Sequence, residues 1–247
     1  MSIPGFFEGL SWSFFRDIED KVIASTKYVE LATQNLEVFS IEFANFLFQI
    51  STNLEATFKA MLHSPCLSED SYARGIREKE LRGDDLNISD YREIFEKFYH
   101  LSQCEVVVAP QTLRLVVRPF DGFQDGKSPV WWKTYNEVKH DLSMNFKKAT
   151  LRMVLDSLSG LFLLNVVHLD ARNFLIENKI LKEYDTEYQS TAGPYKAEQL
   201  KKRYSTLHHF EIEVPDSLVF VSKLLLFQPA GCKENWDQKN LYWFRYL

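Results

Sequence analysis

Three polar side chains in the segment 131–141 have the types and spacing needed for chemistry on a phosphodiester. If the segment is helical, Lys133, Asn136 and His140 fall at positions i, i+3 and i+7 and share one face. A histidine exchanges protons near neutral pH, an asparagine one turn before it can orient a phosphate or ribose hydroxyl, and a lysine offsets negative charge. The set suits metal-independent RNA cleavage, in which the ribose 2′-hydroxyl attacks the adjacent phosphorus.

One histidine per chain is a small set of proton-transfer groups for such a reaction. A two-fold dimer would bring two of these helices together and supply a pair of histidines. We therefore expect a homodimer, with RNA as a candidate partner. The competing interpretation is that His140 is a hydrogen-bonded structural residue of its helix and has no catalytic role.

Four further side chains are candidates for binding a substrate. Tyr135 and Lys139 lie at i, i+4 on the face next to that of His140. Glu55 and Lys59 have the same spacing on an earlier predicted helix. That spacing predicts either an exposed surface ion pair or two residues that lie beside the site and help to order it.

The elements that must position these residues are predicted to be helices, because apolar residues recur at three- and four-residue steps. The predicted helices are 28–62, 88–101, 131–142 and 147–170. The last is apolar nearly all round, which is typical of a central, buried helix. Trp131, Trp132 and Val138 are the side chains expected to anchor the helix 131–142 to the core.

The remaining segments are shorter or more polar. Residues 1–27 predict a short amphipathic helix, and 63–90 a loop or a short surface helix. Asn87 or Ser89 is expected to cap the helix that follows. The β-branched and alternating residues of 105–120 predict a small hairpin.

Together these features predict a mainly α fold, a helical bundle with a minor β element. The bundle is expected over 1–175, with a small α+β C-terminal extension over 176–247 packed on it. The extension contains a basic run, 196–203. That run is interpreted either as a solvated helix face or as a patch for phosphates.

Composition narrows the function further. The chain has 247 residues and a net charge of −5, which excludes a globally basic nucleic-acid binder but not a local basic patch. Its three cysteines include no CxxC pair, so a zinc site is not expected. The sequence has no P-loop and no glycine-rich dinucleotide fingerprint, and no cofactor is expected. No signal peptide and no apolar run long enough for a bilayer is apparent, and a cytoplasmic protein is expected.

The segments 51–59 and 135–140, followed by an apolar helix, resemble the HEPN superfamily of helical-bundle proteins. The resemblance implies a metal-independent RNase that dimerises across its motif, of the kind found in prokaryotic toxin–antitoxin and abortive-infection systems. It also implies a possible antitoxin or other defence protein as partner. The family motif is an Arg, then usually a polar residue, then a His, and Asn136 and His140 match the last two.

The sequence departs from this motif at the arginine, whose position is Tyr135 here. Lys133 lies at a permitted interval from His140, but a lysine lacks the planar, bidentate fork with which arginine grips a phosphate. The alternative function is therefore a catalytically inactive HEPN-like module that binds a nucleotide or a partner.

Overall fold

The fold is mainly helical with small antiparallel sheets, in agreement with the sequence prediction. A computed structural model describes residues 6–64, 67–108, 113, 115–168, 182–183, 218–219 and 225–228. The basic run 196–203 and most of the predicted extension 176–247 lie outside these residues, so the division of the chain near residue 175 stays a prediction.

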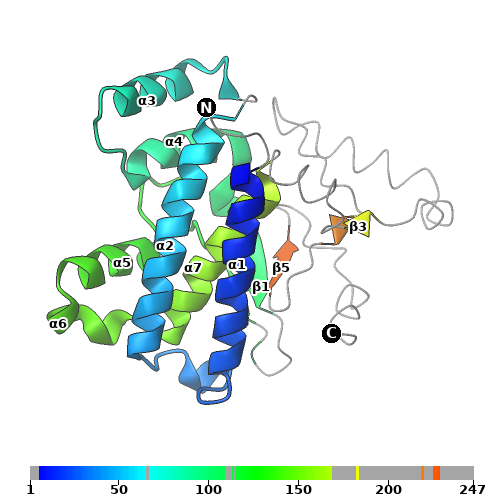
Figure 1. Ribbon diagram of the computed structural model, residues 1–247, viewed down its shortest axis with the longest axis vertical. Coiled ribbons are helices and arrows are strands. Elements are labelled where there is room, and N and C mark those ends of the chain that lie inside the picture. The colour runs from blue at the N-terminus through cyan, green and yellow to red at the C-terminus, as the bar shows by residue number, and fades with distance from the viewer. Residues whose placement is uncertain are drawn as a thin grey trace.

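Three long helices form the centre of the bundle: α1 (Phe6–Ser25), α2 (Ile41–Leu62) and α7 (Leu151–Val167). They lie side by side in Figure 1. Phe15 of α1 packs its ring 5.5 Å from that of Phe162 of α7, and Ile50 of α2 is completely buried. The first segment is thus a helix, though longer than the short one predicted, and the apolar α7 is the buried central helix that its sequence indicated.

The helix predicted over 28–62 is wrong at its start, because α2 begins only at Ile41. Ser40 has an extended backbone, and its hydroxyl accepts a hydrogen bond from the Phe43 amide at 3.0 Å, which caps the helix. The preceding residues form turns and a 3₁₀ helix, η1 (Thr33–Asn35). The Val38 carbonyl there accepts from the Leu151 amide at 2.9 Å, so pairing with the start of α7 replaces helix continuation.

Two shorter helices follow, α3 (Ser71–Leu81) and α4 (Ile88–Tyr99). The first is the short surface helix allowed for in the segment 63–90. The second begins after Asn87, the first of its two predicted caps. It ends before the predicted residue 101, because His100 adopts a left-handed conformation with φ of 47° and the 3₁₀ helix η3 (Leu101–Gln103) follows.

The predicted hairpin is present and gains a third strand. β1 (Glu105–Val108) pairs antiparallel with β2 (Leu115–Val117), with Val106 opposite Val117. On its other side β1 pairs antiparallel with β5 (Leu225–Gln228), with Val108 opposite Leu225. Two further strands, β3 (Lys182–Glu183) and β4 (Leu218–Val219), pair with each other.

The segment predicted as the helix 131–142 is the helix α5 (Val130–His140), and its continuation is broken at Asp141. A single turn, α6 (Leu142–Asn145), and the 3₁₀ helix η4 (Phe146–Lys148) lead from there to α7. The helix predicted over 147–170 begins later, at Leu151, because the Thr150 side chain accepts from the Met153 amide and caps it. Within the described residues, no helix has the length and apolarity to cross a membrane.

Candidate nucleotide-binding pocket on α5

The helix α5 is fixed to the core by the residues predicted to anchor it. The indole Nε1 of Trp131 donates to the Pro119 carbonyl at 2.6 Å, so this buried polar atom is satisfied. The Trp131 ring lies edge-on to that of Phe120, at 6.0 Å between centroids, and Val138 is completely buried. A helix held in this way presents its remaining side chains in fixed directions.

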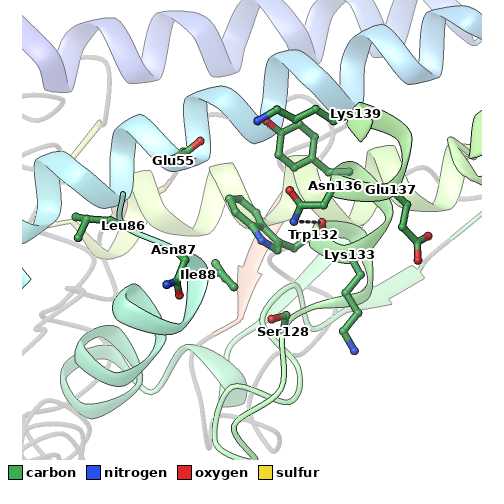
Figure 2. A pocket seen from close by; sticks show the side chains of 11 residues that line it. Glu55, Leu86, Asn87, Ile88, Ser128, Trp132, Lys133, Asn136, Glu137 and Lys139 are labelled. Carbon is green, nitrogen blue, oxygen red and sulfur yellow. Dashed lines mark hydrogen bonds between the residues drawn. The ribbon is translucent and has the colours of Figure 1, made fainter. Parts of the chain in front are cut away.

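A pocket of about 520 Å³ lies along α5, between α2 and the start of α4. Figure 2 shows Glu55 reaching it from α2, Asn87 and Ile88 from the start of α4, and Trp132 and Asn136 from α5. Of the candidate site residues, five line this pocket: Glu55, Lys133, Tyr135, Asn136 and Lys139. Helices far apart in the sequence therefore bring most of the predicted set together.

Two aromatic rings on α5 form part of the apolar lining of the pocket. The rings of Trp132 and Tyr135 lie 5.5 Å apart between centroids, and the Tyr135 ring also meets Phe48 edge-on at 6.2 Å. Only 8% of Trp132 and 5% of Tyr135 are exposed, so both rings are held by packing and offer a limited edge to a ligand. Such rings change little in conformational freedom when a flat ligand binds.

The polar side chains of α5 are arranged around these rings. The Asn136 amide donates to the Trp132 carbonyl at 3.1 Å, which fixes its orientation. The Lys139 ammonium lies 5.4 Å from the centroid of the Tyr135 ring, a cation–π contact at the predicted i, i+4 spacing. Lys133 is exposed and extends away from Glu55 (Figure 2).

His140 and Lys59 lie outside the pocket lining. His140 is exposed in the last turn of α5, and within the described residues it has no hydrogen-bond or ion-pair partner. The buried partner required by a structural role for His140 is therefore absent from the described part of the chain. Lys59 is exposed and makes no ion pair with Glu55, so the predicted surface pair does not form.

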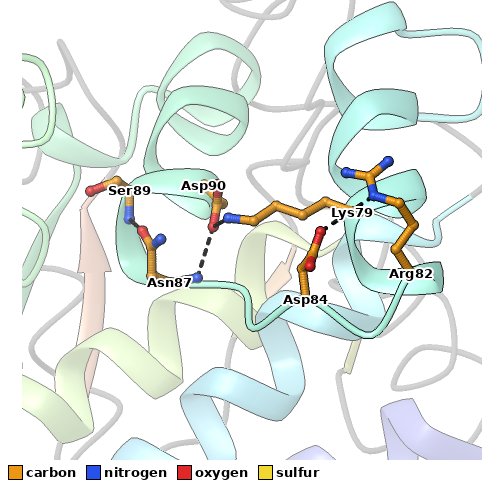
Figure 3. A network of polar contacts seen from close by, with 6 residues as sticks. All are labelled: Lys79, Arg82, Asp84, Asn87, Ser89 and Asp90. Atoms are coloured by element: carbon orange, nitrogen blue, oxygen red, sulfur yellow. Dashed lines mark hydrogen bonds and ion pairs between the residues drawn. The ribbon is translucent and has the colours of Figure 1, made fainter.

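The wall contributed by α4 is held by a network of polar contacts, shown in Figure 3. The Asp90 carboxylate accepts from the Asn87 amide at 2.8 Å and from the Lys79 ammonium of α3 at 2.8 Å. The Asn87 side chain accepts in turn from the Ser89 amide at 2.8 Å. These contacts form a capping box that fixes the start of α4 and joins it to α3.

Glu55 places a carboxylate at the pocket, and its charge acts on the neighbouring Tyr91. Burial raises the pKa of Tyr91, and the negative charges of Glu55, Glu80 and Asp90 raise that pKa further. The Tyr91 hydroxyl is buried, and it has no hydrogen-bond partner among the described residues. Glu55 itself is half-buried.

Sequence reasoning missed the contribution of Trp132 and Asn87 to the pocket. It assigned Trp132 to the core and gave Asn87 or Ser89 as the helix cap; Trp132 is buried and Asn87 is the cap. Each residue also faces the pocket because α2, α4 and α5 meet there. Only the packing of these three helices reveals this second role.

No cluster of three or more histidine, cysteine, aspartate or glutamate side chains able to hold a metal ion occurs within the described residues. Comparison of the chain with protein-family models, with curated proteins and with solved structures gave no match in any of the three.

Proposed function

We propose that this chain is a HEPN-like cytoplasmic protein that binds single-stranded RNA through the pocket on α5. The observation that carries the proposal is that Trp132 and Tyr135 line the same pocket as Lys133 and Lys139. Aromatic surfaces beside a few cationic groups are the usual means of holding unpaired nucleotides. Because only an edge of each ring is exposed, the base meets an edge, which contributes less than the roughly 1–3 kcal/mol of full stacking. The lysines hold the phosphates.

The overall charge of −5 makes this a local interaction. A chain with that charge does not attract RNA over its whole surface, so the affinity must come from the pocket itself. If Lys133 and Lys139 each neutralise one phosphate, the logarithm of the binding constant should fall with the logarithm of salt concentration at a slope of about −1.4.

The test is fluorescence anisotropy of a labelled single-stranded RNA, with a metal chelator present. We expect saturable binding that weakens at least tenfold in Lys133→Glu and in Lys139→Glu. Lys27→Glu is the matched control, because Lys27 is exposed and does not line the pocket. No binding by the wild-type protein, or equal weakening by Lys27→Glu, would refute the proposal.

The second candidate is the metal-independent ribonuclease that the family resemblance implies, acting as a homodimer of the toxin type. It is favoured by the exposure of His140 on the same helix as Asn136, where a second copy could approach it. Cleavage of RNA in the presence of a chelator, its loss in His140→Ala and a dimer in sedimentation would establish this activity. If the RNA is bound but stays intact, and the protein is a monomer in sedimentation, the protein binds RNA without cleaving it and the ribonuclease candidate is excluded.

A further inference from the structure

The pocket contains a carboxylate, that of Glu55, with no partner among the residues that the structure describes. Glu55 lines the pocket, is half-buried, and within the described residues makes no hydrogen bond or ion pair. The other glutamate of the lining, Glu137, is paired with Lys148 at 2.8 Å. A half-buried carboxylate that lacks donors is stabilised by a ligand that brings them.

The cations of the pocket do not neutralise Glu55. Neither Lys133 nor Lys139 forms an ion pair within the part of the chain that the structure describes. Figure 2 shows Glu55 approaching from α2, while Lys133 extends away on the opposite side of Trp132. A matching ligand therefore has hydrogen-bond donors at one end and negative charge at the other, as a nucleotide does.

Among the four bases of RNA, guanine fits such a carboxylate best. The Watson–Crick edge of guanine carries two adjacent donors, N1–H and N2–H, which can reach the two oxygens of one carboxylate in parallel. Adenine and cytosine each set a single amino donor beside a ring nitrogen acceptor, which a carboxylate repels. Uracil places one N–H between two carbonyl oxygens. A charged acceptor with two oxygens thus separates guanine from the other three bases.

We propose that the pocket on α5 selects guanine, with the Glu55 carboxylate accepting from the base and Lys133 and Lys139 holding its phosphates. In Figure 2 Trp132 lies between Glu55 and Lys133, so its exposed edge is placed to meet the base, while Lys139 lies over the Tyr135 ring. This inference rests on the proposed RNA binding and assigns it a base. A peptide cation would also suit Glu55, but the positive charges of Lys133 and Lys139 in the same pocket oppose it.

The experiment compares four labelled RNA pentamers, UUGUU, UUAUU, UUCUU and UUUUU, by fluorescence anisotropy with a chelator present. The wild-type protein is expected to bind UUGUU at least tenfold more tightly than the other three. Glu55→Gln should abolish that preference, because its side chain keeps the shape but replaces one acceptor oxygen with a donor. The control Glu42→Gln removes an exposed carboxylate from α2 that does not line the pocket, and should behave as wild type.

The possible results separate this inference from the proposed function. Equal binding of all four RNAs by the wild-type protein, or an unchanged preference in a Glu55→Gln variant with a wild-type melting temperature, would overturn guanine selection and leave RNA binding in place. Failure of the wild-type protein to bind any of the four RNAs would overturn both. A partially unfolded Glu55→Gln variant is replaced by Glu55→Asp, which shortens the reach and should also reduce the preference.

Discussion

At the scale of single residues, Asp156 on α7 shows burial competing with an ion pair. The Arg152 Nε donates to both Asp156 oxygens, at 2.8 and 3.0 Å, while the Asp156 side chain is only 13% exposed. Burial raises the pKa of Asp156, and the neighbouring Arg152 lowers it by less, so that the pKa reaches about 6. Burial therefore costs the ionised carboxylate more than its partner returns.

The raised pKa predicts how Asp156 affects stability as pH changes. Because the folded-state pKa lies above the unfolded value of 3.8, the folded state binds more protons, and the contribution of Asp156 falls as pH rises from about 4 to about 6. Relative to Asp156→Asn, the wild-type free energy of unfolding should fall by roughly 2 kcal/mol over that range. Urea unfolding of both proteins at pH 4 and pH 7 measures this. If the free energy of unfolding of the wild type relative to that of Asp156→Asn instead rises with pH, the ion pair with Arg152 outweighs the cost of burial.

The residues of the site were predictable in type and only partly in place. The spacing of Lys133, Asn136 and His140 correctly placed all three on one helix, and the i, i+4 contact of Tyr135 with Lys139 is present. The pocket is lined by Lys133 and Asn136 of the predicted face together with Trp132 and Tyr135, and His140, at the end of α5, falls outside it. Helical periodicity gives the order of residues around a helix, but the neighbouring helices decide which side is enclosed.

At the scale of elements, Gly160 allows the loop before α5 to pack closely on α7. A Cβ at this position would lie 3.4 Å from Phe120, 3.5 Å from Pro119 and 3.6 Å from Trp131. These are ordinary contact distances, so one methyl group fits and a larger side chain does not.

The effect of a substitution at Gly160 on the free energy of unfolding should therefore depend on the size of the new side chain: a small one stabilises and a large one destabilises. Gly160→Ala is expected to raise the free energy of unfolding by about 0.5–1 kcal/mol, because alanine restricts the unfolded chain and favours the helix. Gly160→Leu should lower it by roughly 1–3 kcal/mol through overpacking against Phe120 and Trp131. Chemical denaturation tests both, and a destabilising alanine would show that this contact has no room for a methyl group.

The start of α4 depends on Asp90 more than on its neighbour Asp84. Asp90→Ala removes the acceptor of both the Asn87 amide and Lys79, and should cost about 1–2 kcal/mol of stability. Asp84→Ala is the matched control. The Asp84 side chain is 51% exposed, whereas that of Asp90 is 14% exposed. Asp84 pairs with Arg82 at 3.3 Å, and because this pair is exposed, its loss should change stability by no more than about 0.5 kcal/mol. Equal losses in the thermal or urea stability of the two variants would contradict a specific cap.

Elements were predicted better than their boundaries. The caps at Asn87 and Thr150 are local signals, and the helices that they begin lie within a few residues of the prediction. The start of α2 was missed because the residues before Ser40 have no glycine or proline to break a helix, and their backbone instead pairs with α7. The pairing of β5 with β1 joins residues about 120 positions apart, and no periodicity in either strand identifies its partner.

At the scale of the whole molecule, the bundle serves to hold α5 against α2 and the start of α4. The net charge of −5 and the small number of cations in the pocket mean that RNA would be held at one place and not along a broad surface. A homodimer would bring the two His140 side chains together only if α5 lies at the interface and His140 faces the partner. The proposed RNA-binding pocket lies within one chain, so RNA binding there can be tested without reference to the dimer.

The most direct measurement is ultraviolet crosslinking of a single-stranded RNA to the wild-type protein, followed by mass spectrometry of the tryptic peptides. Trypsin separates residues 128–133, which carry Trp132, from 134–139, which carry Tyr135. We predict that crosslinked nucleotides map to these two peptides and that excess unlabelled RNA removes them. Crosslinks confined to peptides outside α2, α4 and α5, or no crosslinks at RNA concentrations that saturate binding, would contradict RNA binding at this pocket.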